Sequence, residues 1–192
     1  MDTRTKLKEA KFFLDALIET QDELEKFNYN LSAFLNAWRS VLDVMLYDFV
    51  EKYPLGLTRD DKVTDHDFWI AANALNLRDA LRFIEWWRQK QGALKNNPLW
   101  KKRIITTHKG YPEMIQRFYV TGSGANSTTI SGDAVISSAV PHEEAIPITP
   151  APSPELRFED FPTQSITDLC TRAFNEMDGI VQEVEREFQV RL

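Results

Sequence analysis

The chain has 192 residues, of which 43% are hydrophobic and 27% are charged, and its formal net charge at pH 7 is -6. This length suits a single domain of ordinary size, and the composition is typical of a globular protein. The negative charge argues against a surface that binds nucleic acid over its whole extent, and the single Cys170 excludes an internal disulfide.

The start of the chain, MDTRTKLKEA, is charged from residue 2 and has no apolar core of a signal peptide. No apolar run is long enough to span a membrane. We therefore expect a cytoplasmic protein without a membrane partner.

Two long helices are predicted first. Residues 5–27 carry apolar side chains at three- and four-residue spacing, namely Leu7, Ala10, Leu14, Leu17 and Leu24. Asn28-Tyr29-Asn30 is the predicted break, and a second helix then runs to about Tyr53 with Leu31, Phe34, Trp38, Val41, Met45 and Phe49 on one face. Pro54 and Gly56 end it. We expect these helices to pack antiparallel across a short connection.

A third helical stripe begins near Asp65 or Asp67 and continues to about Leu94. The sequence Asn96-Asn97-Pro98 interrupts it, and Pro98 is suited to the first turn of another short helix, which Gly110 would end. That short helix carries Trp100, Arg103 and His108. We assign Trp87 to the core, while Trp86 and Trp100 are open to either a core role or a role as stacking faces for unpaired bases.

Residues 118–162 differ in kind, because they hold six of the nine prolines and a run rich in Gly, Ser and Thr. We expect an irregular or β-hairpin excursion, with weak strand candidates at 118–120, 128–130 and 134–136. A last helix begins at about Ser165, within residues 163–192. The predicted fold is all-α: a single domain, 1–192, forming a four- to five-helix bundle. Its core includes Leu14, Leu17, Phe34, Trp38, Met45, Ile84, Trp87, Met177 and Ile180.

The segment from Trp86 to Pro112 is basic and contains no acidic residue; its cations are Arg88, Lys90, Lys95, Lys101, Lys102, Arg103 and Lys109. Arg103 and His108 are five positions apart. A guanidinium can bind a phosphate through two parallel hydrogen bonds, and an imidazole can exchange protons near neutral pH. Together they could cleave RNA, with Lys101, Lys102 and Lys109 raising the local potential.

A plainer interpretation is a surface helix that ends in a basic turn, which the helix dipole favours. Positions five apart on an ideal helix point about 140° away from each other. Arg103 and His108 would therefore converge on one phosphate only at a frayed helix end or across a two-fold dimer. Arg39 and Asp43, four apart, could form a surface ion pair or a polar patch facing a cleft. The sequence shows no metal-ligand spacing, and we expect no metal or other cofactor.

Two blocks of the sequence resemble HEPN-domain proteins. The first is FNYNLSAFLNAWRSVLDVMLYDFVEKY, residues 27–53, and the second is NPLWKKRIITTHKGYP, residues 97–112. In these proteins a Leu-Ser-Ala-Phe helix precedes a block of Asn/Asp-Pro-Leu, an Arg with a His five positions on, and Lys-Gly. The order and separation of the two blocks agree, although they cover under a quarter of the chain.

The resemblance implies a helical bundle that often dimerises and, in active members, metal-independent RNA cleavage. Such domains often act as toxins or phage-defence effectors, some beside an antitoxin-like partner protein. By position, Arg103 would hold the scissile phosphate and His108 would be the acid–base residue. The family usually has a polar residue, commonly Asn, where this chain has Ile104, and a second alignment places Lys102 in the Arg position. The alternative is therefore a non-catalytic module that binds nucleotide, RNA or a protein partner through residues 86–112.

Overall fold

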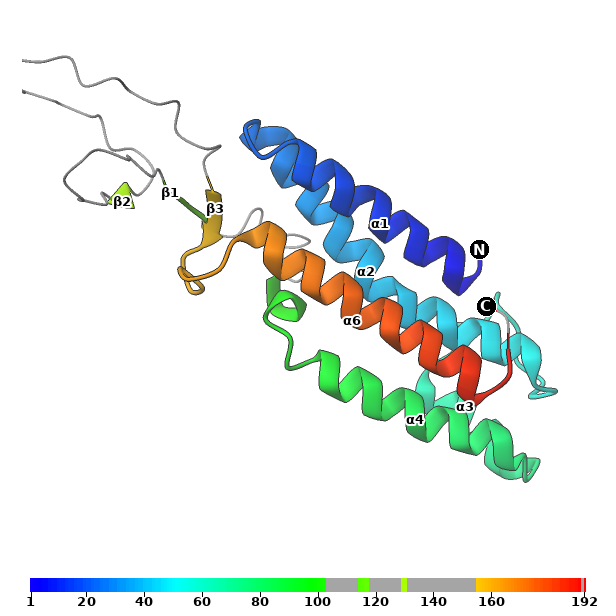
Figure 1. The fold of residues 1–192 in the computed structure, drawn as a ribbon. Coiled ribbons are helices and arrows are strands. Elements are labelled where there is room, and N and C mark those ends of the chain that lie inside the picture. The colour runs from blue at the N-terminus through cyan, green and yellow to red at the C-terminus, as the bar shows by residue number, and fades with distance from the viewer. Residues whose placement is uncertain (103–113, 118–128, 131–154, 191) are drawn as a thin grey trace, which may run out of the picture.

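The computed structural model describes residues 1–102, 114–117, 129–130, 155–190 and 192. Its main body is a bundle of helices, shown in Figure 1: α1 (Thr3–Glu19), α2 (Leu24–Lys52), α3 (Asp65–Ala74), α4 (Arg78–Leu94) and α6 (Ile166–Glu187). Residues 98–102 are also helical. The helix α1 packs along α2, α6 packs against both, and α3 packs against α4. The predicted all-α bundle is confirmed.

The first interhelical turn lies earlier than the predicted break at residues 28–30. The helix α1 ends at Glu19, and α2 has already begun at Leu24. Asn30 is part of α2, and its Nδ2 donates to the carbonyl oxygen of Ala16 at 3.3 Å and to Oγ1 of Thr20 at 3.1 Å. Asn30, on the neighbouring helix, thus satisfies polar groups at the end of α1. The spacing of apolar residues within one segment does not reveal such a contact between helices.

The predicted helix from residue 65 to residue 94 is divided into α3 and α4. Asn76 has a φ of 50°, in the left-handed region that ends helices, and the amide of Leu77 donates to the carbonyl oxygen of Ala72. The start of α3 is fixed by a capping box in which the side chains of Thr64 and Asp67 bond to each other's backbone amides. The apolar stripe continues across this break, so the break cannot be recognised from the periodicity of apolar residues alone.

A small antiparallel sheet lies at one end of the bundle, with strands β1 (Met114–Arg117), β2 (Thr129–Ile130) and β3 (Glu155–Phe158) in the order β2-β1-β3. The strand β2 coincides with the candidate at 128–130, whereas the candidates at 118–120 and 134–136 lie outside the described residues. β3 falls within the segment predicted to be irregular or a hairpin, and it was not predicted as a strand. Its Leu156 and Phe158 are buried and join the core.

All nine of the predicted core residues are buried. Two tryptophans join elements through their indole nitrogens as well as through their rings. Nε1 of Trp38 donates to the carbonyl oxygen of Ala173 on α6 at 2.9 Å, and Nε1 of Trp87 donates to that of Leu42 on α2 at 3.0 Å. These hydrogen bonds satisfy buried donors and fix the relative positions of α2, α4 and α6.

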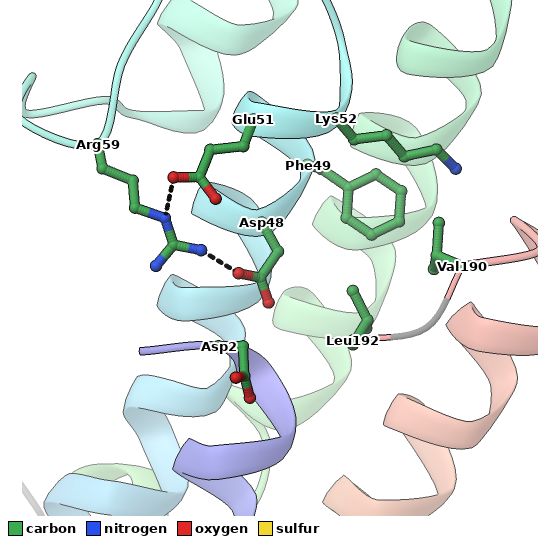
Figure 2. Close-up of a pocket in the computed structure, with 8 residues that line it drawn as sticks. All are labelled: Asp2, Asp48, Phe49, Glu51, Lys52, Arg59, Val190 and Leu192. Atoms are coloured by element: carbon green, nitrogen blue, oxygen red, sulfur yellow. Dashed lines mark hydrogen bonds and ion pairs between the residues drawn. The ribbon is translucent and has the colours of Figure 1, made fainter.

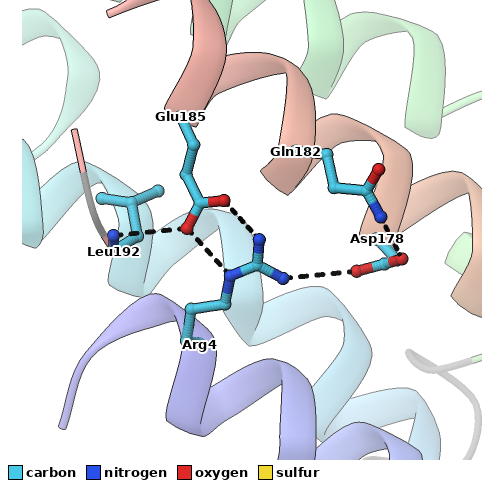
Figure 3. A network of polar contacts seen from close by, with 5 residues as sticks. All are labelled: Arg4, Asp178, Gln182, Glu185 and Leu192. Atoms are coloured by element: carbon cyan, nitrogen blue, oxygen red, sulfur yellow. Dashed lines mark hydrogen bonds and ion pairs between the residues drawn. The ribbon is translucent and has the colours of Figure 1, made fainter. Parts of the chain in front are cut away.

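Charged side chains on the flanks of α6 connect it to α1 and α4. Arg4 of α1 bonds Glu185 and also reaches Asp178 on α6 at 3.5 Å, as Figure 3 shows. Glu183 accepts from Lys90 at 2.7 Å and from Nε1 of Trp86 at 2.8 Å, and these bonds lower its pKa. Because that pKa is lower in the folded chain than in the unfolded one, the stabilisation is present above the ordinary Glu value of 4.5 and is lost as the pH falls through the folded value.

Candidate functional site

A groove lies beside the short helix at 98–102. It is at the point where the basic segment, residues 86–112, passes from the turn after α4 into that helix. It has a volume of about 530 Å³ and is lined by Lys95, Asn96, Asn97, Pro98, Lys101, Lys102, Asp160 and Phe161. One wall is the turn after α4 together with the first turn of the short helix, and the other is the connection between β3 and α6. Oδ1 of Asn97 accepts from the amide of Leu99 at 3.0 Å, which caps this helix and fixes the turn.

The three lysines of the groove differ in environment. Lys102 is buried, its Nζ donates to Asp160 at 2.6 Å, and it lies 4.8 Å from the ring centroid of Phe158. Lys95 and Lys101 are exposed, and the ion pairs recorded for the described residues include neither of them. The groove therefore offers two cations to an anionic ligand and holds the third in an internal ion pair.

Acidic residues from elsewhere in the chain neutralise further cations of the basic segment. Arg88 pairs with Asp65 of α3 at 2.7 Å, and Lys90 pairs with Glu183 of α6 at 2.7 Å. Within the described part of this run, residues 86–102, the positive charge is therefore not continuous, and its cations without an ion pair to another described residue are Lys95 and Lys101.

Three of the predicted site residues, Arg103, His108 and Lys109, lie outside the described residues. Lys101 and Lys102 are described, and Arg103 follows Lys102 directly in the sequence. The groove is thus adjacent along the chain to the predicted catalytic arginine. The sequence analysis missed Asp160 and Phe161. Asp160 is 58 residues beyond Lys102, and Phe161 follows it, so no local pattern connects them to the basic segment.

Arg39, which was predicted to support the site, packs its guanidinium over the ring of Trp100. Its guanidinium carbon is 4.7 Å from the ring centroid of Trp100, and its Nε is buried with no hydrogen-bond partner among the described residues. Asp43, the other predicted supporting residue, is exposed one helical turn further along α2. The cation–π contact holds the Arg39 side chain against the short helix that leads into the predicted motif.

Trp86 and Trp100, which the sequence left open, are both buried, with exposed fractions of 8% and 9%. The ring of Trp100 packs edge-on against Trp38, with 6.2 Å between the centroids. Trp87 is buried as predicted. The interpretation of these tryptophans as open stacking faces for bases is therefore wrong: the rings pack in the bundle.

A second cavity, shown in Figure 2, has a volume of about 370 Å³ and is lined by Asp2, Asp48, Phe49, Glu51, Lys52, Arg59, Val190 and Leu192. Arg59 is bonded to Asp48 and to Glu51. Nζ of Lys52 donates to the carbonyl oxygen of Phe188 at 3.0 Å, and burial lowers the pKa of Lys52. Since three carboxylates line this cavity and its arginine is already paired, it suits an anionic ligand less well than the groove does.

Cys170 is buried in α6, and burial raises the pKa of its thiol, so it is not an activated nucleophile. Among the described residues, no three His, Cys, Asp or Glu side chains are grouped as metal ligands would be. A search of the same residues finds no helix with the length and apolar character of a membrane span. No family model matches this chain, and no curated protein or solved structure has significant similarity to it.

Proposed function

We propose that this protein cleaves RNA without a metal ion, in the manner of HEPN ribonucleases, as a toxin or defence nuclease. The observation that supports this most directly is the groove with Lys95 and Lys101 on its rim, which lies immediately before Arg103 in the chain. A polyanion bound along this groove would meet two exposed cations before it reaches the residues of the motif. The helical bundle is compatible with the same proposal, but it carries less weight because one fold serves many functions.

In the proposed reaction, a 2′-hydroxyl group attacks the adjacent phosphorus. A base removes the proton of that hydroxyl, the 2′-oxygen bonds to phosphorus, and the bond from phosphorus to the 5′-oxygen breaks. A proton is delivered to the departing 5′-oxygen. His108 serves as base or acid, Arg103 stabilises charge on the phosphoryl oxygens, and Lys101 contacts a neighbouring phosphate. The products are a 2′,3′-cyclic phosphate and a 5′-hydroxyl end.

The test is purified protein incubated with mixed single-stranded RNA in the presence of EDTA. We expect fragments with 2′,3′-cyclic phosphate ends, and no cleavage of a matched substrate that has 2′-deoxyribose throughout. RNA that stays intact over a wide range of protein concentrations would exclude catalysis. Cleavage of the deoxy substrate would exclude this mechanism, because that substrate lacks the attacking hydroxyl.

We also propose that the protein is a two-fold homodimer, because Arg103 and His108 diverge by about 140° on an ideal helix. An isologous interface would bring two such pairs into one cleft. We expect sedimentation at micromolar concentration to give twice the mass of the 22.3 kDa chain. A strictly monomeric species that still cleaves RNA would refute the composite site. An antitoxin-like protein partner belongs to the same proposal and rests on the resemblance alone.

The second candidate function is a binding module without catalysis, and two features favour it. Ile104 follows Arg103 where HEPN proteins commonly have a polar residue, and Lys102 is engaged by Asp160. Such a module would use the same groove to hold RNA or nucleotide and would leave the RNA intact in the assay above.

Both functions predict that Lys101→Glu weakens RNA binding, because Lys101 is exposed on the groove and forms no ion pair with any residue that the structure describes. The slope of log affinity against log salt should become shallower by about 1, since one phosphate contact is lost. Fluorescence anisotropy with labelled RNA over a salt series measures this. Lys8→Glu, the same change at an exposed position of α1, is the matched control. Equal losses in the two variants would mean that only the net charge matters.

A further inference from the structure

A smaller cavity of about 210 Å³ adjoins the groove and shares Asn97 and Pro98 with it. Its other lining residues are Gln164, Leu169, Arg172 and Glu176, which come from the first half of α6 and the turn before it. The cavity and the groove are thus two compartments on either side of the Asn97-Pro98 turn. One compartment is rimmed by exposed lysines, and the other combines hydrogen-bonding side chains with the apolar surfaces of Pro98 and Leu169.

The polar groups of the smaller cavity are held in defined orientations. Asn97 uses its Oδ1 to cap the short helix, so its Nδ2 is directed to Glu176, where it donates to Oε2 at 3.1 Å. Arg172 donates to Oε1 of Gln164. This second bond leaves the amide nitrogen of Gln164 and further N–H groups of Arg172 as donors. The cavity lining therefore combines a carboxylate acceptor with amide and guanidinium donors, and Arg172 and Glu176 are neighbours one turn apart on α6.

We propose that this cavity is a nucleobase subsite that selects guanine. Guanine has two adjacent donors, N1–H and the N2 amino group, and two adjacent acceptors, O6 and N7. The Glu176 carboxylate matches the donors, and Arg172 with Gln164 matches the acceptors. Pro98 and Leu169 provide apolar surface for the faces of the ring.

The other three bases fit this arrangement less well. Adenine presents an unprotonated N1 where guanine presents N1–H, so the acceptor-only carboxylate of Glu176 would lie against another acceptor. Cytosine and uracil each supply one donor group on the paired edge, which leaves part of the carboxylate without a partner. Gln164, Arg172 and Glu176 are exposed in the free chain, so the discrimination arises when the bound base excludes water from them. A polar group that loses water and is left unpaired lowers affinity, and sites that hydrogen-bond their ligand reject analogues for this reason.

This inference rests on the proposed function for its substrate, single-stranded RNA whose unstacked bases can enter a pocket. A guanosine with its base in the smaller cavity would place its phosphate on the side of the shared turn where Lys95 and Lys101 lie. The groove would then hold the sugar–phosphate chain, and the cavity would set the position at which the chain is bound.

The experiment is isothermal titration of the full chain with guanosine, adenosine, cytidine and uridine 3′-monophosphates at low salt. We expect guanosine monophosphate to bind at least about tenfold more tightly than the others, since a matched two-point contact to a base discriminates by about this much. Glu176→Gln should remove most of that preference while retaining the binding that comes from the phosphate. Glu85→Gln, the same change at an exposed position on α4, should leave the preference unchanged.

Equal affinity for all four nucleotides, no binding of any, or a guanine preference that persists in Glu176→Gln would each overturn the inference. Circular dichroism of the variant confirms that the helices are intact. The failure of this inference can be told apart from the failure of the proposed function. RNA cleavage without base preference would remove the guanine subsite alone, whereas guanine-selective binding without cleavage would remove the catalysis and keep the subsite.

Discussion

Replacing His108 by alanine should lower RNA cleavage by about 10²–10⁴-fold, the loss expected when one general acid–base group is removed. RNA affinity should change little, because Lys95 and Lys101, which are charged and exposed, would supply most of the attraction of phosphates. Single-turnover cleavage with EDTA and anisotropy on the same preparation measure the two quantities. Wild type and variant with the same residual rate would exclude His108 as a catalytic group.

The arginine variants complete this test. Arg103→Ala should reduce both affinity and cleavage rate, because it removes a charge that would contact phosphate. Arg103→Lys should restore affinity more than rate, since a lysine cannot reproduce the two parallel hydrogen bonds of a guanidinium. Full rescue of the rate by lysine would show that only charge, and not bidentate geometry, is required at this position.

Replacing Trp38 by alanine should lower the free energy of unfolding by about 3–5 kcal/mol, the usual cost of deleting a large buried aromatic side chain. Trp38 is fully buried, bonds the carbonyl oxygen of Ala173, and packs against Trp100. The variant therefore loses a hydrogen bond between α2 and α6. It also loses the ring contact with Trp100 that supports the short helix at 98–102. Urea denaturation followed by circular dichroism gives the free energy.

Trp38→Phe is the informative control, because it keeps most of the apolar volume and deletes the indole donor. It should be less destabilised than Trp38→Ala, and its RNA affinity should stay close to that of the wild type. A loss below about 1 kcal/mol for Trp38→Ala would contradict the central position of this side chain in the core.

The sequence was sufficient to predict the helical bundle and its core, because each helix buries a stripe whose period matches the helical repeat. Met45, Ile84 and Met177 are examples from three different helices, and all are buried. The helix boundaries were predicted less well. The break at Asn76 lies inside an uninterrupted stripe, and Asn30 acts on the end of α1 from a different helix.

The candidate site was predicted only in part, for a related reason. The positive charge of residues 86–112 is evident in the sequence, but the partners that neutralise Arg88, Lys90 and Lys102 come from distant segments. The sequence is compatible with Trp86 and Trp100 facing either solvent or the core. In the structure both are buried by tertiary packing. Long-range pairing of this kind depends on how the elements fold together, which periodicity does not encode.

The ion pair between Lys102 and Asp160 has a consequence for chain length. It joins two positions that are 58 residues apart, one in the short helix at 98–102 and the other in the connection between β3 and α6. Since doubling the length of a closed loop costs only about 0.6 kcal/mol, the entropic cost of this closure depends weakly on the number of residues that separate the two positions. Related chains could therefore differ greatly in length at this point and still share one helical body and one groove.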